Sequence, residues 1–132
     1  MISFLDADIV IWLTRGSAEA SQLLGQLTQK SGRTLAMLVA QRAEVVFFLR
    51  DVEVANVERL LSGFEMHPVT TEIVDFAASL CRRWHPSHGI GVNDALLAAA
   101  ATLVSGEIVT QNVKHFPMPE VRVRQGWDPR SP

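Results

Sequence analysis

Short apolar runs alternate along this chain with longer segments in which apolar residues return every three or four positions. The short runs predict β-strands at residues 2–5, 34–37, 64–69, 107–110 and 121–123. The longer segments predict helices at residues 7–14, 17–30, 38–50, 54–61, 70–84 and 94–104. Strands that alternate with helices indicate an open parallel sheet with helices on both faces. The pattern therefore predicts an α/β fold.

Several of these boundaries depend on single residues. Gly16 and Gly106 follow helical segments, as glycines at helix C-termini commonly do. Asn93 is expected to cap the helix that begins at Asp94. The segment from His85 to Gly91 contains a proline and two glycines, and we expect a loop there.

The chain length favours one domain over residues 1–132, with a tail over 125–132 that we expect to fray. Apolar residues make up 48 % of the chain and charged residues 20 %, which is typical of a globular protein. The longest apolar run, Ala95 to Ala101, is too short to cross a bilayer, and the N-terminus does not have a signal-peptide pattern. Cys81 is the single cysteine, so an internal disulfide is impossible. We expect a cytoplasmic protein without membrane contact.

The net charge of −2 neither indicates nor excludes nucleic-acid binding, because an acidic cluster would cancel a basic rim in the sum. Ten of the twelve basic residues are arginine, the side chain best shaped for bidentate phosphate contacts. The candidate phosphate contacts are Arg82, Arg83, Lys114, Arg122 and Arg124. Trp12 and Trp84 are candidate base-stacking platforms. A core position is the preferred interpretation for Trp84, whereas for Trp12 both interpretations stay open.

Four polar residues that could form a functional site lie next to apolar segments or within them. Asp6 follows the first strand, Glu44 lies within an apolar helical stretch, Asp94 opens an alanine-rich helix, and Asn112 follows the strand that contains Val109. Carboxylates next to a core are costly unless something satisfies them. Carboxylates that converge are the ligands of a hard divalent cation. Ligands bind beyond the carboxyl ends of parallel strands, which is where Asp6 and Asn112 are expected.

Each of these four residues also has an ordinary structural interpretation. Glu44 alone would be a solvated residue at a helix edge. Asn112 alone would be a loop residue, and Asp6 alone would be a turn former at the end of a strand. Asp94 alone would be an acid in a first helical turn, where the helix dipole favours its ionised form. The combination favours a site, because three of the four fall at one edge of the predicted sheet. The alanines behind Asp94 should let its helix approach the sheet closely.

The motifs around these residues resemble those of the PIN-domain ribonucleases, and among them the VapC-type toxins of bacterial toxin–antitoxin pairs. The resemblance runs from the first strand to the last. The stretches that carry it are Phe4 to Ile11, Ala43-Glu44, His88 to Ala99, and Val109 to Phe116. It implies a PIN-like fold and a metal-dependent endoribonuclease, with RNA as the substrate and a cognate antitoxin as the partner.

The resemblance further implies that Mg²⁺ or Mn²⁺ is bound by Asp6 and Asp94, with Glu44 binding through water or a second ion. Asn112 would orient a water molecule or a ligand as a neutral group. Apolar residues such as Phe47, Phe48 and Leu49 exceed what one small core covers, and we expect a homodimer.

This chain departs from the family pattern at three positions. Leu38 and Gln41 stand where the family often carries Ser or Thr ahead of the helical Glu, so the start of that helix should be poorly capped. Asp8 stands where Asn or Ser is common, and it could join the metal shell from the second sphere or point into solvent.

Two alternatives compete with the ribonuclease. The departures at Leu38 and Gln41 leave open a non-catalytic PIN-like module that binds RNA or protein. The opening Asp6-Ala7-Asp8 also matches haloacid-dehalogenase-type phosphatases, in which the first Asp is the nucleophile. That chemistry needs a downstream lysine and a late acidic pair. Lys30 and Lys114 are the only lysines, and no late pair of aspartates follows.

Overall fold

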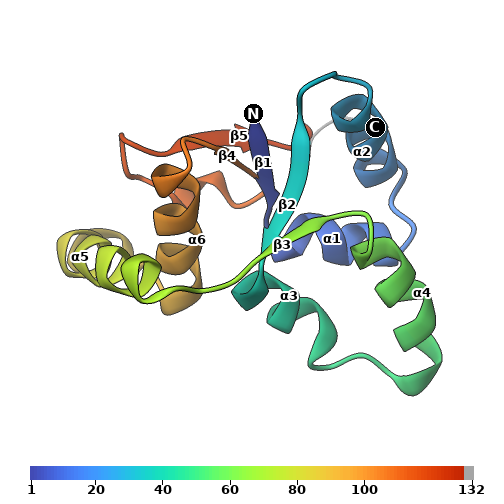
Figure 1. Cartoon of the computed structure of the whole chain (residues 1–132), viewed down its shortest axis with the longest axis horizontal. Helices are drawn as coiled ribbons and strands as arrows, with labels where there is room; N and C mark the ends of the chain where they lie inside the picture. The colour runs from blue at the N-terminus through green and yellow to red at the C-terminus, as the bar shows by residue number, and fades with distance from the viewer. Residues whose placement is uncertain (130–132) are drawn as a thin grey trace.

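The computed structural model describes residues 1–129 and contains one five-stranded sheet (Figure 1). The strands are β1 (Ile2–Leu5), β2 (Thr34–Leu38), β3 (Glu65–His67), β4 (Glu107–Thr110) and β5 (Arg122–Gln125). Every pairing is parallel, and the strand order is β3-β2-β1-β4-β5. The predicted open parallel sheet is therefore confirmed.

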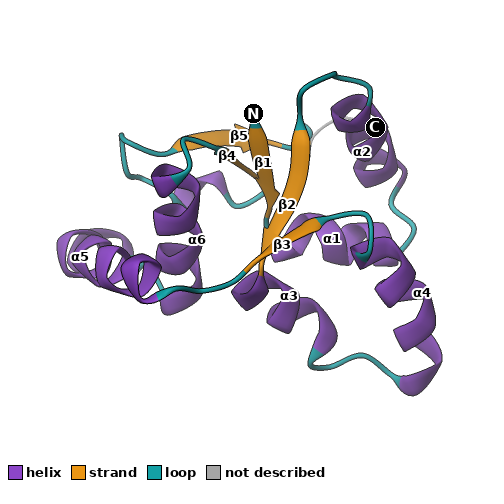
Figure 2. Ribbon diagram, viewed as in Figure 1, coloured by secondary structure: helices purple, strands orange, loops and turns teal. Residues whose placement is uncertain are grey.

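Helices cover both faces of this sheet, as the alternation of elements predicted (Figure 2). Helices α5 and α6 pack on one face, and α1, α2 and α4 pack on the other. The helices are α1 (Ala7–Thr14), α2 (Ala18–Thr28), α3 (Val39–Val46), α4 (Asp51–Leu61), α5 (Thr71–His88) and α6 (Val92–Leu103), with a short 3-10 helix η1 (Val113–His115). No helix within residues 1–129 has the length and apolarity needed to cross a membrane.

The core has two halves because neighbouring strand residues point to opposite faces of the sheet. Phe4 and Ile108 pack with the helices α5 and α6, whereas Leu5 and Val109 pack with α1, α2 and α4. The strands β1 and β4 are thus buried on both faces, which is typical of a parallel sheet. This explains why apolar residues stand at consecutive positions in both strands, Phe4-Leu5 and Ile108-Val109.

Helix α6 lies close to the sheet because its packed face consists largely of alanine. Ala98, Ala99 and Ala101 are fully buried, and the helix contacts both β1 and β4. The close approach was expected from the sequence. It carries the first turn of α6, with Asp94, toward the end of β1.

The loop predicted from His85 to Gly91 is wrong over its first half, because α5 continues through Pro86 to His88. Pro86 has no N–H to donate to the carbonyl of Arg82, so it weakens the helix, which ends two residues further on. Gly89 then adopts φ 64° and its N–H donates to His85 O at 2.8 Å, which terminates the helix.

The starts of two other helices also differ from the prediction. Gly91, rather than Asn93, is the N-cap of α6, so Asn93 lies inside the first turn and its side chain is available for another contact. The predicted helix 38–50 ends at Val46, and α4 begins at Asp51 rather than at Val54. Leu38 provides no side-chain cap for α3, as expected.

The tail expected to fray over 125–132 is ordered at its start. Gln125 is the last residue of β5, opposite Thr110 on β4. Trp127 packs against the core on the α1 side, and its backbone N–H donates to Gln111 Oε1 at 2.9 Å. Residues 130–132 of that prediction lie outside the described residues.

The strand order fixes where a ligand should bind. From β1 the chain moves outward to β2 and β3, then crosses back to β4 on the other side of β1 and continues to β5. The order therefore reverses between β1 and β4. In an open α/β sheet, the crevice beyond the carboxyl ends of two such strands is the usual binding position.

Candidate active site

Asp6 is the residue at which β1 ends and α1 begins. Its Oδ1 accepts from the N–H of Ala7 at 2.8 Å, so it acts as the N-cap of α1. Its Oδ2 accepts from Thr110 Oγ1 at 2.9 Å. Only 6 % of the residue is exposed. A carboxylate this buried is held in one orientation by the two donors.

Asp8 lies in the first turn of α1 and faces the same region. Its Oδ1 accepts from the N–H of Ile9 at 2.7 Å. Its Oδ2 accepts from the Gln111 N–H at 2.9 Å and from Asn112 Nδ2 at 3.2 Å. The sequence left open whether Asp8 points into solvent, and the structure turns it toward the loop that follows β4.

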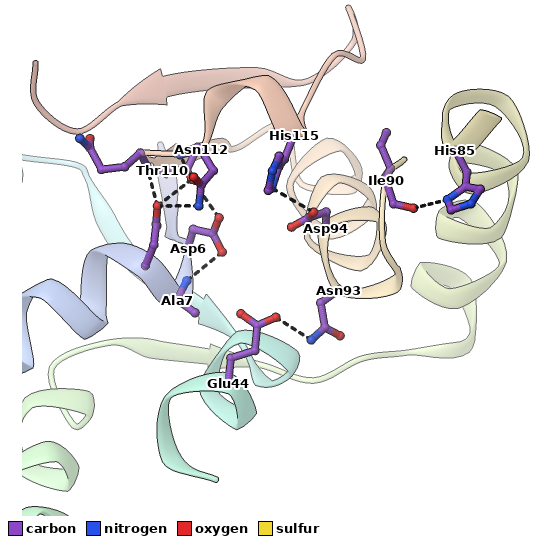
Figure 3. Close-up of polar contacts among 12 residues, drawn as sticks. Asp6, Ala7, Glu44, His85, Ile90, Asn93, Asp94, Thr110, Asn112 and His115 are labelled. Atoms are coloured by element: carbon purple, nitrogen blue, oxygen red, sulfur yellow. Dashed lines mark hydrogen bonds and ion pairs between the residues drawn. The ribbon is translucent and has the colours of Figure 1, made fainter. Parts of the chain in front are cut away.

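Asp94 comes from the first turn of α6 and is half-buried. Its Oδ2 lies 3.4 Å from Nδ1 of His115, which is carried by η1. The two side chains meet in Figure 3 on the side of the site opposite the Asp6–Thr110 pair.

Glu44 reaches the site from α3 and is tied to the start of α6. Its Oε1 accepts from Asn93 Nδ2 at 2.7 Å. One turn earlier on α3, the buried Gln41 donates from Nε2 to the backbone O of Asn93 at 3.0 Å. Two bonds therefore join α3 to α6. They set the distance between the segment that carries Glu44 and the segment that carries Asp94.

A cavity of about 290 Å³ lies among these side chains. Its lining residues are Asp6, Ala7, Asp8, Ile11, Glu44, Asp94, Asn112 and His115. Figure 3 shows Asp6, Glu44 and Asp94 approaching one space from three different elements. The structure thus brings together all four residues that the sequence singled out, and adds Asp8 and His115.

Asn112 contributes to the cavity differently from the expectation. Its Nδ2 donates to Asp8 Oδ2, and its backbone N–H donates to Thr110 Oγ1 at 3.0 Å. The amide group therefore holds a neighbouring carboxylate. The sequence could not indicate this contact, because Asp8 and Asn112 are 104 positions apart.

Burial raises the pKa values of three carboxyl groups in this cavity. It raises the pKa of Asp6 to about 7, and the negative charge of Asp8 adds to the shift, while hydrogen bonds from Thr110 and Ala7 oppose it. Burial also raises the pKa of Asp8 and that of Asp94. The sequence predicted that Asp94 would favour its ionised form, but burial raises its pKa. Ionising the whole group is therefore unfavourable without a compensating cation.

The donors in this cavity fit a hard divalent cation. They are carboxylate and amide oxygens beside the imidazole of His115, and the residues that line the cavity include neither lysine nor arginine. Burial is the main cause of the raised pKa of Asp6, and the negative charge of Asp8 adds to it, so a bound cation would favour the ionised form. Over residues 1–129 no three His, Cys, Asp or Glu side chains are already drawn together as a metal-binding group. The side chains would thus have to move inward to share one ion.

Two residues that support the site were missed at the sequence level. Thr110 was interpreted only as the end of a strand, although pairing of β1 with β4 places it beside Asp6. Asn93 was interpreted as a helix cap, although it binds Glu44. The signal for Thr110 was available in principle, since a hydroxyl at the carboxyl end of a strand faces that crevice. The signal for Asn93 depended on locating the helix start correctly.

Comparison with known proteins agrees with this geometry. The PIN domain family model matches residues 3–117, and the chain belongs to that family. It is 36 % identical over 115 residues to "Ribonuclease VapC10" of Mycobacterium tuberculosis, covering 86 % of this chain and 85 % of that protein. It is 34 % identical over 118 residues to "Ribonuclease VapC19" of the same organism, covering 89 % and 94 %.

A solved structure shows the same fold. The crystal structure of VapBC2 from Rickettsia felis, bound to a DNA fragment from its promoter, contains a chain that superposes with a TM-score of 0.82. The superposition covers 97 % of this chain and all of the other, at 23 % sequence identity. Membership of the PIN family removes the haloacid-dehalogenase-type phosphatase as an alternative.

Proposed function

We propose that this protein is an endoribonuclease that depends on Mg²⁺ or Mn²⁺ and serves as the toxin of a VapBC-type toxin–antitoxin pair. The observation that carries the proposal is the cavity lined by Asp6, Asp8, Glu44 and Asp94 at the switch point of the sheet. The ribonuclease names of relatives at 34–36 % identity support it. We expect the protein to act in the cytoplasm, where its proposed substrate is found.

In this proposal Asp6 and Asp94 hold the ion directly, and Glu44 holds it through water or holds a second ion. When bound, the ion neutralises the phosphodiester, lowers the pKa of a water molecule and stabilises the leaving oxygen. Few protein ligands are needed, because Mg²⁺ keeps several of its waters.

The other side chains set the positions of these carboxylates. Thr110 orients Asp6 by donating to Oδ2, and Asn93 orients Glu44 by donating to Oε1. His115 faces Asp94 Oδ2 and limits where that carboxylate can turn. Asn112 holds Asp8 and would also orient a water molecule at the rim. Attack by water leaves a 5′-phosphate and a 3′-hydroxyl, and it makes no use of the RNA 2′-hydroxyl.

The proposed protein partner is a cognate antitoxin. A basic residue of that partner, arginine by preference, would enter the acidic cavity in place of the metal. Phe47 and Phe48 at the end of α3 are 74 % and 90 % exposed, and they supply an apolar surface suited to protein contact. We also propose a homodimer, which analytical ultracentrifugation of the free protein tests.

Growth and RNA mapping in a bacterial host test this function. Induced wild-type protein should arrest growth, and new RNA ends carrying 5′-phosphates should appear. Co-expression of a cognate antitoxin should relieve the arrest. Asp6→Asn should accumulate to the same level without arrest or new ends. Harmless expression of soluble wild type would instead favour a PIN-like module that binds without cutting.

A further inference from the structure

A second cleft, of about 410 Å³, is lined by two tryptophans from opposite ends of the chain. Its lining residues are Trp12, Ser17, Glu19, Gln111, Trp127 and Pro129. Trp12 is 45 % exposed, so its indole faces solvent rather than the core. Exposed aromatic rings that border a cleft are surfaces on which flat ligands stack.

This cleft adjoins the acidic cavity. Asp8 and Trp12 are four residues apart on α1, so their side chains lie on the same face of the helix, one turn from each other. Gln111 lines the cleft, and its backbone N–H donates to Asp8 Oδ2 at 2.9 Å. A ligand in the cleft would therefore lie next to a phosphate in the cavity.

The backbone of Trp127 is held in place by the side chain of Gln111. Gln111 Nε2 donates to Trp127 O at 3.0 Å, and the Trp127 N–H donates to Gln111 Oε1 at 2.9 Å. Gly126 permits this approach, because a Cβ there would lie only 3.0 Å from Gln111 Oε1 and from Leu23 Cδ2. The Trp127 backbone is thus fixed against the same residue that binds Asp8, and the relative positions of cleft and cavity are set by direct bonds.

The charges around the cleft favour a base over a phosphate. Glu19 presents a carboxylate in the wall, and its Oε2 accepts from Ser17 Oγ at 3.1 Å. This negative charge repels a phosphate group but accepts hydrogen bonds from the amino and imino groups of a nucleobase. The guanidinium of Arg15 lies 5.9 Å from the centre of the Trp12 ring, at an exposed position suited to a backbone phosphate.

We propose that this cleft binds one unpaired nucleobase of the RNA substrate, from a nucleotide close to the bond that is cut. The inference rests on the proposed ribonuclease function and specifies its substrate as single-stranded at that nucleotide. Trp12 is the stacking residue, half-buried Trp127 lines the cleft beside it, and Glu19 reads the edge of the base. Stacking of this kind tolerates different bases, so Glu19 would supply the preference for one of them.

Kinetics on a short single-stranded RNA test the assignment. Trp12→Ala should raise KM by about 5- to 100-fold, the range that loss of one stacked base produces, and should leave kcat nearly unchanged because no reacting group is touched. Trp12→Phe keeps a ring and should recover most of the loss. Trp84→Phe is the matched control, because Trp84 packs against the core on the opposite face of the sheet.

An abasic scan locates the bound nucleotide. Replacing one nucleotide at a time with an abasic residue should weaken wild-type cleavage strongly at one position near the cut. Trp12→Ala should be insensitive to the abasic residue at that same position. Equal KM values for wild type and Trp12→Ala, with identical abasic profiles, would overturn the proposal while leaving the ribonuclease intact. An unchanged KM with weakened antitoxin binding would also overturn it, since the cleft would then serve the protein partner.

A binding measurement keeps this test separate from the proposed function. If the wild type cuts no RNA, the ribonuclease assignment fails, and quenching of tryptophan fluorescence by the same RNA is measured with chelator present. Weaker RNA binding by Trp12→Ala than by Trp12→Phe supports the cleft. Equal binding by the two variants overturns it.

Discussion

Thr110 Oγ1 donates to Asp6 Oδ2 at 2.9 Å across 104 positions of sequence. The contact exists because β1 and β4 pair in parallel with Leu5 opposite Val109, which places Asp6, just past the end of β1, beside Thr110, the last residue of β4. The same hydroxyl oxygen accepts from the Asn112 N–H. One small side chain therefore fixes the first carboxylate of the site and the loop that carries its neutral amide.

Replacing Thr110 tests this relationship. Thr110→Val keeps the shape but leaves the buried Asp6 oxygen without its donor, which should lower the free energy of unfolding by about 1–3 kcal/mol. The pKa of Asp6 should rise further, because the Thr110 hydrogen bond lowers it in the wild type. Urea unfolding and ¹³C NMR titration of the metal-free protein measure both effects. Thr110→Ser retains the hydroxyl and should behave almost as the wild type. Equal damage from Ser and Val would mean that packing, rather than the hydrogen bond, matters at this position.

The raised pKa of Asp6 predicts how the stability of the metal-free protein depends on pH. Its pKa is about 7 when folded against an ordinary value of 3.8, so the folded state holds the proton more tightly. The contribution of Asp6 to the free energy of unfolding is therefore fully present below about pH 4 and is lost as the pH rises through about 7. Each unit of pKa difference corresponds to about 1.4 kcal/mol, so ionisation of Asp6 alone lowers the free energy of unfolding by at most roughly 4 kcal/mol.

Melting curves with chelator present measure this loss between pH 4 and 8. Asp6→Asn carries no titrating group, so its melting temperature should fall less over that range and exceed the wild type's at pH 8. Asp75→Asn, which removes an exposed carboxylate on α5, should follow the wild type. Identical slopes for wild type and Asp6→Asn would contradict a raised pKa.

The fold was predictable because it depends on local pattern, whereas the site depended partly on contacts between distant residues. The apolar runs of β1 and β4 mark central strands without further information, and Asp6 and Asn112 follow from their ends. The alanines of α6 likewise predicted its close packing. Pro86 led to a wrong helix boundary, because a proline commonly marks the end of a helix, whereas α5 continues for two residues beyond it.

The hydrogen-bond partners of the site could not be predicted from one sequence. Glu44 has an ordinary helix-edge pattern, and only the fold shows that Asn93 is its partner. Asp8 lies in the first turn of α1, and whether it faces solvent depends on the path of the chain after β4. Such contacts are fixed by tertiary packing, on which local periodicity carries no information.

The bond between Asn93 and Glu44 predicts a supporting role for Asn93. Asn93→Ala should free Glu44 and lower its contribution to metal binding, with a loss of about 10- to 100-fold in apparent Mg²⁺ affinity, as for other groups that orient metal ligands. Maximal activity at saturating Mg²⁺ should fall less. Activity measured against Mg²⁺ concentration separates the two effects. Asn56→Ala, an exposed amide on α4, serves as the control. A maximal rate that falls while Mg²⁺ affinity stays constant would rule out positioning of Glu44.

Asn112 should respond to substitution in two opposite ways. Asn112→Ala removes the donor to Asp8 and should weaken activation by Mg²⁺ by about 10- to 100-fold. Asn112→Asp places a carboxylate against Asp8, so the metal-free protein should melt at a lower temperature. Mg²⁺ should then raise its melting temperature by more than it does in the wild type. Thermal melts with and without Mg²⁺ show this, and wild-type behaviour of both variants would make Asn112 a loop residue only.

Cleavage of total cellular RNA by the purified protein tests the central claim most directly. With Mg²⁺ or Mn²⁺ the wild type should cut RNA, and chelation should stop it reversibly. Asp6→Asn and Asp94→Asn should each lower the rate by about 100-fold or more, because each removes a charged group from the cavity that would hold the ion. Cleavage that survives chelation, or that both variants perform at the wild-type rate in a preparation free of other nucleases, would contradict the assignment.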